Sequence, residues 1–269
     1  MRLDGARVLL TGASRGIGEA TAYELAAAGA IVTLVARRKT ALEKVAARVR
    51  DHGAEAHVVA ADMSKEDAVL AMVAEAEKAM GGIDVLVNNA GLGLSAPVAD
   101  IEPADLRYVL EVNLIAPHVA TRAVLPKMLK RRRGAIVNVG SVASHIATPD
   151  LGGYSATKFA LKALSDALRM ELQGSGVHVT LVCPGPIATE FAESVRGSFP
   201  EHYPSRPVGA PASDVGRAIV KAIQRRQAEV FVPAYYQAVV GVDSIAPQLM
   251  RVGGKRGMKI ATRLAEKVL

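Results

Sequence analysis

Cysteine and aromatic residues are scarce in this chain. Its 269 residues include a single cysteine, Cys183, no tryptophan, and only 4% aromatic residues. One cysteine excludes an intramolecular disulfide framework and a zinc site built from cysteines. The six histidines show no ligand spacing, so no metal site is predicted. Few rings are present to stack on bases, which argues against nucleic-acid binding.

Long apolar runs are also missing. No stretch of about 18 uncharged apolar residues occurs, so no membrane span is expected. The opening residues Met-Arg-Leu-Asp-Gly contain no apolar signal-peptide core. We therefore expect a soluble, cytoplasmic protein.

The net charge of +7 is concentrated near the end of the chain. Residues 251–269 hold six basic residues and one acidic residue, a net +5, which leaves +2 for the other 250 residues. The body therefore lacks the basic excess expected of a nucleic-acid-binding protein. A basic, partly apolar tail could make peripheral contact with an anionic membrane. We favour the alternative of a helix that packs on the substrate lobe or on a neighbouring subunit.

Short apolar runs alternate with helical patterns over roughly the first 180 residues. Runs of Val, Ile and Leu without interspersed polar residues predict strands buried on both faces, as in a parallel sheet covered by helices. This alternation predicts one α/β domain, a Rossmann-type doubly wound parallel sheet of about seven strands with helices on both faces. Strands are expected at 6–10, 31–35, 56–60, 83–87, 135–139 and 177–182, and helices at 17–28, 40–50, 65–80, 103–114 and 117–131.

The pattern changes after Cys183. Residues 186–213 contain five prolines and no clear period, which predicts a functional substrate loop. A helix near 214–226 and a strand near 230–232 would complete a catalytic domain over 1–233. Residues 234–269 are expected to form a helical, basic extension of the same domain.

A glycine-rich segment, Thr-Gly-Ala-Ser-Arg-Gly-Ile-Gly at 11–18, lies between the first predicted strand and helix. Glycines let a backbone approach a pyrophosphate, and a helix N-terminus supplies N–H groups and a positive dipole. The spacing G-x-x-x-G-x-G departs from the common G-x-G-x-x-G fingerprint. Its position at the first strand-to-helix turn nevertheless predicts a dinucleotide site.

The end of the second predicted strand indicates which dinucleotide binds. Sites that prefer NAD place an acid there for the ribose 2′-hydroxyl, whereas this chain has Ala36. Arg37, with Arg15 from the glycine-rich segment, offers forked donors for a 2′-phosphate. Arg37 and Arg38 could instead be solvated charges at a strand end. We favour NADP(H) over NAD(H).

Ser141, Tyr154 and Lys158 form a candidate proton-transfer group. Tyr154 and Lys158 are positions i and i+4 of a predicted helix and so share one face. A tyrosine with the ordinary pKa near 10 is a poor acid at pH 7, and an adjacent ammonium lowers that pKa by stabilising phenolate. Ser141 could hold a carbonyl oxygen while Tyr154 protonates it.

Together these motifs resemble the short-chain dehydrogenase/reductase family, from about residue 5 to residue 232. The resemblance implies a catalytic tetrad of Asn113, Ser141, Tyr154 and Lys158, with a relay water at Asn113. It implies that Asp62 contacts adenine, although Asp62 could instead be a helix-start residue. The positions that match the family's cofactor contacts are Gly12, Ser14, Arg15, Gly16, Ile17, Gly18, Arg37, Arg38, Asp62, Met63, Asn89, Ala90, Gly91, Tyr154, Lys158, Pro184, Gly185, Ile187 and Thr189.

The resemblance implies hydride transfer between the nicotinamide, here that of NADP(H), and a carbonyl or secondary alcohol. The apolar residues of the substrate loop, among them Phe191 and Val208, predict a moderately apolar small molecule as the substrate. The alternative is a non-catalytic NADP-binding sensor or scaffold on the same fold. Family members are usually homodimers or homotetramers. His145 could line the substrate pocket, and Cys183 is expected to be a small buried hydrophobe.

Overall fold

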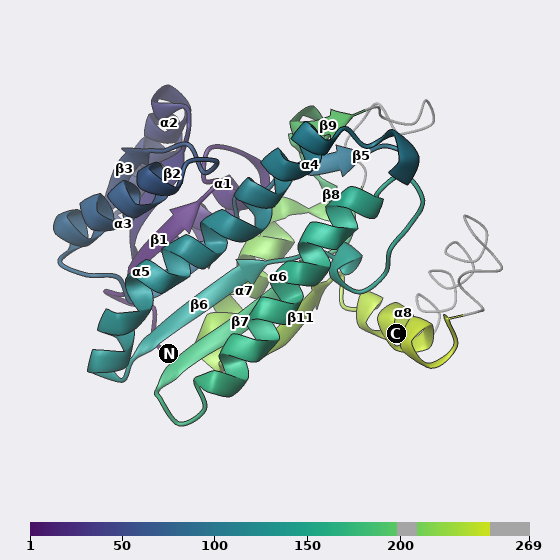
Figure 1. Cartoon of the computed structure of the whole chain (residues 1–269). Coiled ribbons are helices and arrows are strands. Elements are labelled where there is room, and N and C mark those ends of the chain that lie inside the picture. Colours follow the sequence, from purple (N-terminus) through teal and green to yellow (C-terminus); the bar gives the residue numbers. More distant parts are fainter. Residues whose placement is uncertain (198–208, 248–269) are drawn as a thin grey trace.

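The computed structural model describes residues 1–197 and 209–247, and its centre is a seven-stranded sheet in the order β11-β7-β6-β4-β1-β2-β3 (Figure 1). Every neighbouring pair in this sheet is parallel. The predicted doubly wound parallel sheet is therefore confirmed. Its strands are β1 (Arg7–Thr11), β2 (Ile31–Ala36), β3 (Ala56–Ala60), β4 (Val85–Asn88), β6 (Gly134–Val139), β7 (Val177–Pro184) and β11 (Glu229–Val232).

Helices cover both faces of the sheet. Within β1, Val8 and Leu10 pack into one apolar cluster and Leu9 into the other, because successive side chains of a strand point to opposite faces. The first cluster is completed by α1, α2 and α7, and the second by α3 and α5. The main helices are α1 (Gly16–Ala27), α2 (Lys39–Asp51), α3 (Glu66–Met80), α4 (Pro103–Leu110), α5 (Ala116–Arg131), α6 (Gly152–Glu171), α7 (Ala212–Arg225) and α8 (Tyr236–Ile245).

The predicted helix over 103–114 is corrected by the structure. Regular α4 ends at Leu110, and residues Glu111–Ile115 form one π-helical stretch, η2, that continues into α5. A π-helical turn accommodates an extra residue and is common at functional sites. Asn113, a predicted catalytic residue, lies within it.

The substrate loop contains short regular pieces that its sequence pattern does not predict. They are β8 (Ile187–Ala188), η4 (Glu190–Ser194), β9 (Val195–Gly197) and β10 (Ala210–Pro211). Strand β9 pairs with β5 (Gly93–Ser95), which follows β4. Residues 198–208 of the predicted loop and the basic tail over 251–269 lie outside the described residues. In the described part of the chain, no helix has the length and apolarity needed to cross a bilayer.

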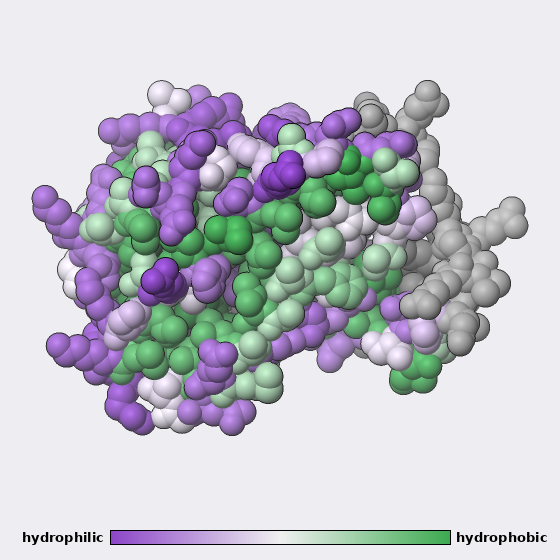
Figure 2. All heavy atoms as spheres, viewed as in Figure 1, coloured by the Kyte–Doolittle hydropathy of each residue, from purple (hydrophilic) through white to green (hydrophobic). Residues whose placement is uncertain are grey.

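Helices α5 and α6 lie side by side on one face of the sheet (Figure 1). Figure 2 shows apolar surface across this face. Large hydrophobic side chains that remain exposed here are Ile115, Leu129, Phe159, Leu164 and Met170.

Candidate active site

The predicted site residues gather at the carboxyl edge of the sheet. The glycine-rich loop follows β1, Asp62 follows β3, Asn89 follows β4, and Ser141 follows β6. Pro184 ends β7. Because all these strands are parallel, their carboxyl ends meet at one edge, where ligands bind in open α/β sheets.

The glycine-rich loop has the geometry of a phosphate cradle. Gly12 and Gly16 have φ angles of +68° and +58°, which favour glycine. A Cβ at Gly12 would lie 2.8 Å from the Ala90 Cα, and one at Gly18 would lie 2.1 Å from the Gly12 oxygen. The N-cap residue of α1, Arg15, gives no side-chain cap. These features fit the dinucleotide pyrophosphate that the sequence predicts at the start of α1.

Asn89 and Thr11 hold this loop against the end of β4. Asn89 Nδ2 donates to the Thr11 oxygen (2.9 Å) and the Gly12 oxygen (3.2 Å). Thr11 Oγ1 accepts hydrogen bonds from the backbone N–H groups of Asn89 and Ala90, both at 3.0 Å. The sequence prediction included Asn89 and Ala90 but missed the supporting role of Thr11. The signal available was a threonine at the end of an otherwise apolar strand.

The two arginines proposed for the 2′-phosphate contact different elements. Arg15 donates to the Glu193 carboxylate at 2.5 Å and to the Ser194 hydroxyl, both in η4. Arg37 lies 3.5 Å from the Tyr108 hydroxyl of α4. Both guanidinium groups are therefore near the carboxyl edge, but Arg15 is bound to the substrate loop.

Asp62 has the geometry of a helix-start residue. Its Oδ1 accepts hydrogen bonds from the Ser64 backbone N–H (3.0 Å) and the Ser64 hydroxyl (2.9 Å). The backbone bond from Ser64 is the main cause that lowers the pKa of Asp62, and the Arg37 charge adds to it. Asp62 thus makes the contacts of a helix-start residue, which was the alternative in the sequence analysis. Its contact with adenine stays a prediction. The side chain of Met63 is buried in the core.

Lys158 is a buried cation beside Tyr154. Its Nζ lies 5.7 Å from the centre of the Tyr154 ring and donates to the Val139 oxygen at 2.9 Å. Only 4% of Lys158 is exposed. Burial lowers the pKa of Lys158 from 10.5 to about 8. The helical spacing of four residues therefore brings the two predicted groups together.

Ser141 connects the ends of β6 and β7. Its hydroxyl donates to the Pro184 oxygen at 3.3 Å and accepts from the Ala143 N–H at 3.1 Å. Ser144 Oγ in turn accepts from the Ser141 N–H at 3.1 Å, which completes a capping box for η3 (Val142–Ser144). Ser144 is fully buried and was not predicted; the Ser-x-x-Ser spacing was its signal.

Asn113 fixes the turn after β4 and approaches Lys158. Its Oδ1 accepts from the Leu92 N–H and its Nδ2 donates to the Leu92 oxygen, both at 2.8 Å. Nδ2 also donates to the Thr157 hydroxyl at 3.0 Å. A Cβ at Gly91 would lie 3.5 Å from both Asn113 Oδ1 and Lys158 Nζ. Asn113, in the π-helical turn, and the Lys158 ammonium thus both lie beside Gly91.

The substrate loop contacts both Tyr154 and the glycine-rich loop. Phe191 of η4 packs with its ring centre 6.0 Å from that of Tyr154. A Cβ at Gly16 would lie 3.2 Å from the Thr189 side chain, so this predicted cofactor contact adjoins the glycine-rich loop. Gly185 packs against Tyr236 of α8.

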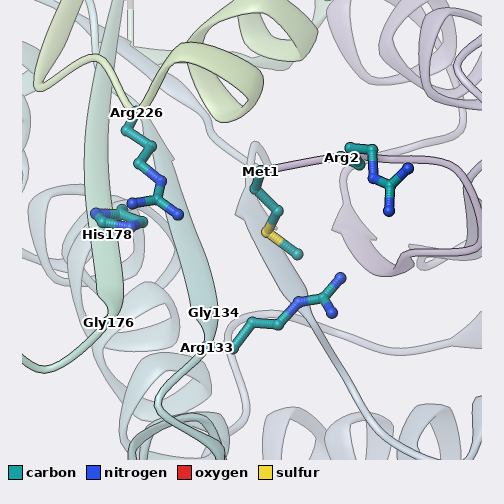
Figure 3. A pocket seen from close by; sticks show the side chains of 7 residues that line it. All are labelled: Met1, Arg2, Arg133, Gly134, Gly176, His178 and Arg226. Atoms are coloured by element: carbon teal, nitrogen blue, oxygen red, sulfur yellow. The ribbon is translucent and has the colours of Figure 1, made fainter.

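A separate basic cavity of about 250 Å³ lies away from these residues (Figure 3). It includes Gly134 and His178 near the starts of β6 and β7. It therefore opens at the amino edge of the sheet, opposite the carboxyl edge. The other lining residues are Met1, Arg2, Arg133, Gly176 and Arg226.

The family model of the short chain dehydrogenases matches residues 6–198. The chain belongs to the short-chain dehydrogenase/reductase family. It is 37% identical to the ketoacyl reductase HetN of a Nostoc species, over 86% of this chain and 79% of that protein. It is 35% identical to 11-beta-hydroxysteroid dehydrogenase 1A of Arabidopsis thaliana, over 98% of this chain and 78% of that protein.

Solved structures similar to this chain belong to the same family, and they include complexes with two different cofactors. A short chain dehydrogenase/reductase from Burkholderia phymatum in complex with NAD has a TM-score of 0.84 and 28% identity, covering 93% of this chain and 96% of that chain. A metagenomic short-chain oxidoreductase in complex with NADP has a TM-score of 0.73 and 34% identity, covering 86% and 97%. This short-chain dehydrogenase/reductase is thus an oxidoreductase by family, with relatives that bind either nicotinamide dinucleotide.

Proposed function

We propose that this short-chain dehydrogenase/reductase transfers a hydride between NADP(H) and a carbonyl or secondary alcohol, with Tyr154 as general acid or base. The observation that carries the proposal is the buried Lys158 ammonium, 5.7 Å from the centre of the Tyr154 ring. Burying a cation costs free energy, and perturbed groups of this kind cluster at functional sites. Lys158 lies at the carboxyl edge of the sheet, the edge at which open α/β sheets bind dinucleotides.

Each residue of the group has one task in the proposed reduction. A bound nicotinamide supplies the hydride when the cofactor is present. The Ser141 hydroxyl orients the carbonyl oxygen, and the Tyr154 hydroxyl donates a proton to that oxygen. The Lys158 ammonium stabilises the phenolate that remains. Oxidation of an alcohol uses the same groups in reverse.

The preference for NADP(H) rests on the end of β2. Ala36 leaves no carboxylate there to accept from a ribose 2′-hydroxyl, whereas Arg37 and Arg15 offer forked donors for a phosphate. We infer carbonyl reduction as the physiological direction, because it is the usual direction for NADPH.

The substrate is inferred to be moderately apolar. Phe191 adjoins Tyr154, and 38% of the phenylalanine remains exposed. Two relatives are named for ketoacyl and hydroxysteroid chemistry. Both names describe carbonyl or alcohol groups on largely apolar molecules.

A homodimer or homotetramer built through α5 and α6 is proposed from the apolar surface in Figure 2. Exposed apolar patches on soluble proteins commonly mark interaction sites. A cytoplasmic location and peripheral membrane contact by the basic tail stay predictions.

The deciding experiment follows oxidation of NADPH, with NADH in parallel, over a panel of ketones, aldehydes and oxoacyl thioesters. Turnover with NADPH that is lost in Tyr154→Phe supports the reductase. Tight NADPH binding without turnover of any panel compound favours the non-catalytic sensor. Better turnover with NADH would contradict the roles given to Arg15 and Arg37.

A further inference from the structure

Three side chains of types that can bind metal ions lie close together near the carboxyl end of β7. His145 Nε2 lies 2.9 Å from Glu229 Oε1, and the Cys183 Sγ lies 3.7 Å from each of these two atoms. The residues come from the segment after η3, from β7 and from β11. They are distant in the sequence, so no ligand spacing announces them. None belongs to the proposed proton-transfer group.

The fold holds the three groups on a rigid support. Strands β7 and β11 pair in register, with Phe231 opposite Cys183. The Phe231 ring packs beside the His145 ring, with the two ring centres 5.3 Å apart. Cys183 is fully buried, whereas one third of the Glu229 side chain is exposed. An ion can therefore enter past Glu229.

The donor spacing suits a tetrahedral zinc site. Bonds of about 2.3 Å to sulfur and 2.0–2.2 Å to nitrogen and oxygen place ligand atoms about 3.4–3.6 Å apart. Both sulfur distances of 3.7 Å fit closely. The 2.9 Å contact between His145 and Glu229 must widen by about half an ångström, which the partly exposed Glu229 allows.

We propose that His145, Cys183 and Glu229 bind a thiophilic divalent cation of the Zn²⁺ type. A thiolate and a carboxylate supply two negative charges, which balance the charge of the ion, and the imidazole is a neutral third ligand. The thiol proton leaves to solvent as the metal binds. Three protein ligands leave a fourth position for water.

Nearby cations do not block the site. Lys162 of α6 faces Cys183 and Glu229, but its ammonium is paired with Asp166 at 2.5 Å. Lys158 also acts on Cys183 from α6. A bound ion would tie Cys183, which precedes Pro184, to His145, which follows Ser141. These are the two segments that the Ser141–Pro184 hydrogen bond already joins.

The single cysteine makes the test unambiguous. Co²⁺ is added to the full chain, and the sulfur-to-cobalt charge-transfer absorption is recorded and then titrated away with Zn²⁺. Only Cys183 can give that band. In parallel, alkylation of the wild-type thiol is timed with and without Zn²⁺. The proposal predicts the band, its loss to Zn²⁺, and protection of the thiol.

Variants identify the other two ligands. His145→Gln and Glu229→Gln should each weaken Co²⁺ binding by at least about 10-fold to 100-fold, and Cys183→Ser should abolish the band. The matched control is His57→Gln, because His57 and Glu55 form a second histidine–glutamate contact of 2.9 Å without a thiol. Binding in that control should equal wild type. No sulfur-to-cobalt band in the folded wild-type chain, or equal loss in His57→Gln, overturns the proposal.

Discussion

Arg15 of the glycine-rich loop is bound to Glu193 of η4 at 2.5 Å. This ion pair joins the proposed 2′-phosphate site to the segment whose Phe191 packs on Tyr154. A 2′-phosphate and the Glu193 carboxylate would therefore compete for one guanidinium. Two thirds of the Glu193 side chain is exposed, so the ion pair between Arg15 and Glu193 contributes little free energy.

Glu193→Gln should tighten NADPH binding by about two- to fivefold, because removing an exposed ion-pair partner releases about 1 kcal/mol or less. NADH, which has no 2′-phosphate, should bind as before. Fluorescence titration of both cofactors measures the effect. Glu190→Gln, in the same short helix, is the matched control, since Glu190 forms no ion pair within the described ranges. Equal tightening of NADH would rule out competition at Arg15.

Arg37→Ala should raise the Kd for NADPH by about 10- to 100-fold, because a charge-assisted hydrogen bond contributes about 1.5–3 kcal/mol. The Kd for NADH should change little. Lys39→Ala, at the exposed start of α2 and outside the predicted contacts, is the control for general loss of positive charge. If Arg37→Ala weakened both cofactors equally, the residue would not read the phosphate.

Lys158 predicts a pH-dependent difference in stability. Burial lowers its pKa from 10.5 to about 8, so between these values the unfolded chain binds more protons than the folded one. The free energy of unfolding of wild type, relative to Lys158→Met, should rise as the pH increases through this window, by the order of 3 kcal/mol. The penalty is complete below pH 8 and disappears above 10.5.

Urea unfolding of both proteins across that pH range tests this prediction. Lys162→Met serves as control, because its partly exposed ammonium is paired with Asp166. A constant difference between wild type and Lys158→Met would show that the lysine is not buried as a cation.

The sheet was predictable because buried parallel strands and amphipathic helices leave local patterns. The alternation of apolar runs gave the strands to within about two residues, and the motif order placed Ser141, Tyr154 and Lys158 at one edge. A helical spacing of four residues is enough to predict that Tyr154 and Lys158 share a face. These inferences need only local periodicity and the geometry of a parallel sheet.

Contacts between distant segments were not predictable. Asn113 lies in a π-helical turn and bonds to Leu92 and Thr157, contacts that no local period reveals. The binding of Arg15 to Glu193 depends on how η4 folds back. The cluster of His145, Cys183 and Glu229 likewise exists only because β11 lies beside β7.

Asn113→Ala should lower the free energy of unfolding by about 1–3 kcal/mol, since it leaves the Leu92 N–H and oxygen without their bonds. Chemical denaturation measures the loss. Asn113→Asp keeps one acceptor for the Leu92 N–H and should recover part of the stability. Full stability in Asn113→Ala would mean that the π-helical turn does not depend on this side chain.

Phe159→Glu should shift the assembly toward smaller species if α6 forms a subunit contact, because a charge placed in an apolar interface is costly. Light scattering after size-exclusion chromatography measures the mass. Leu70→Glu on α3 is the control, since Leu70 is 45% exposed, close to the 41% of Phe159. A monomeric wild type, or an unchanged mass in Phe159→Glu, would contradict a contact through this residue.

The most direct test of the account is transfer of deuterium from the hydride-donating carbon of labelled NADPH to the product. The alcohol formed from a ketone substrate is analysed by mass spectrometry, for wild type and for Tyr154→Phe. We predict deuterium on the new carbinol carbon in wild type, and a rate about 10²- to 10⁴-fold lower in the variant with NADPH still bound. Product formed without deuterium, or formed equally fast by Tyr154→Phe, would contradict hydride transfer assisted by Tyr154.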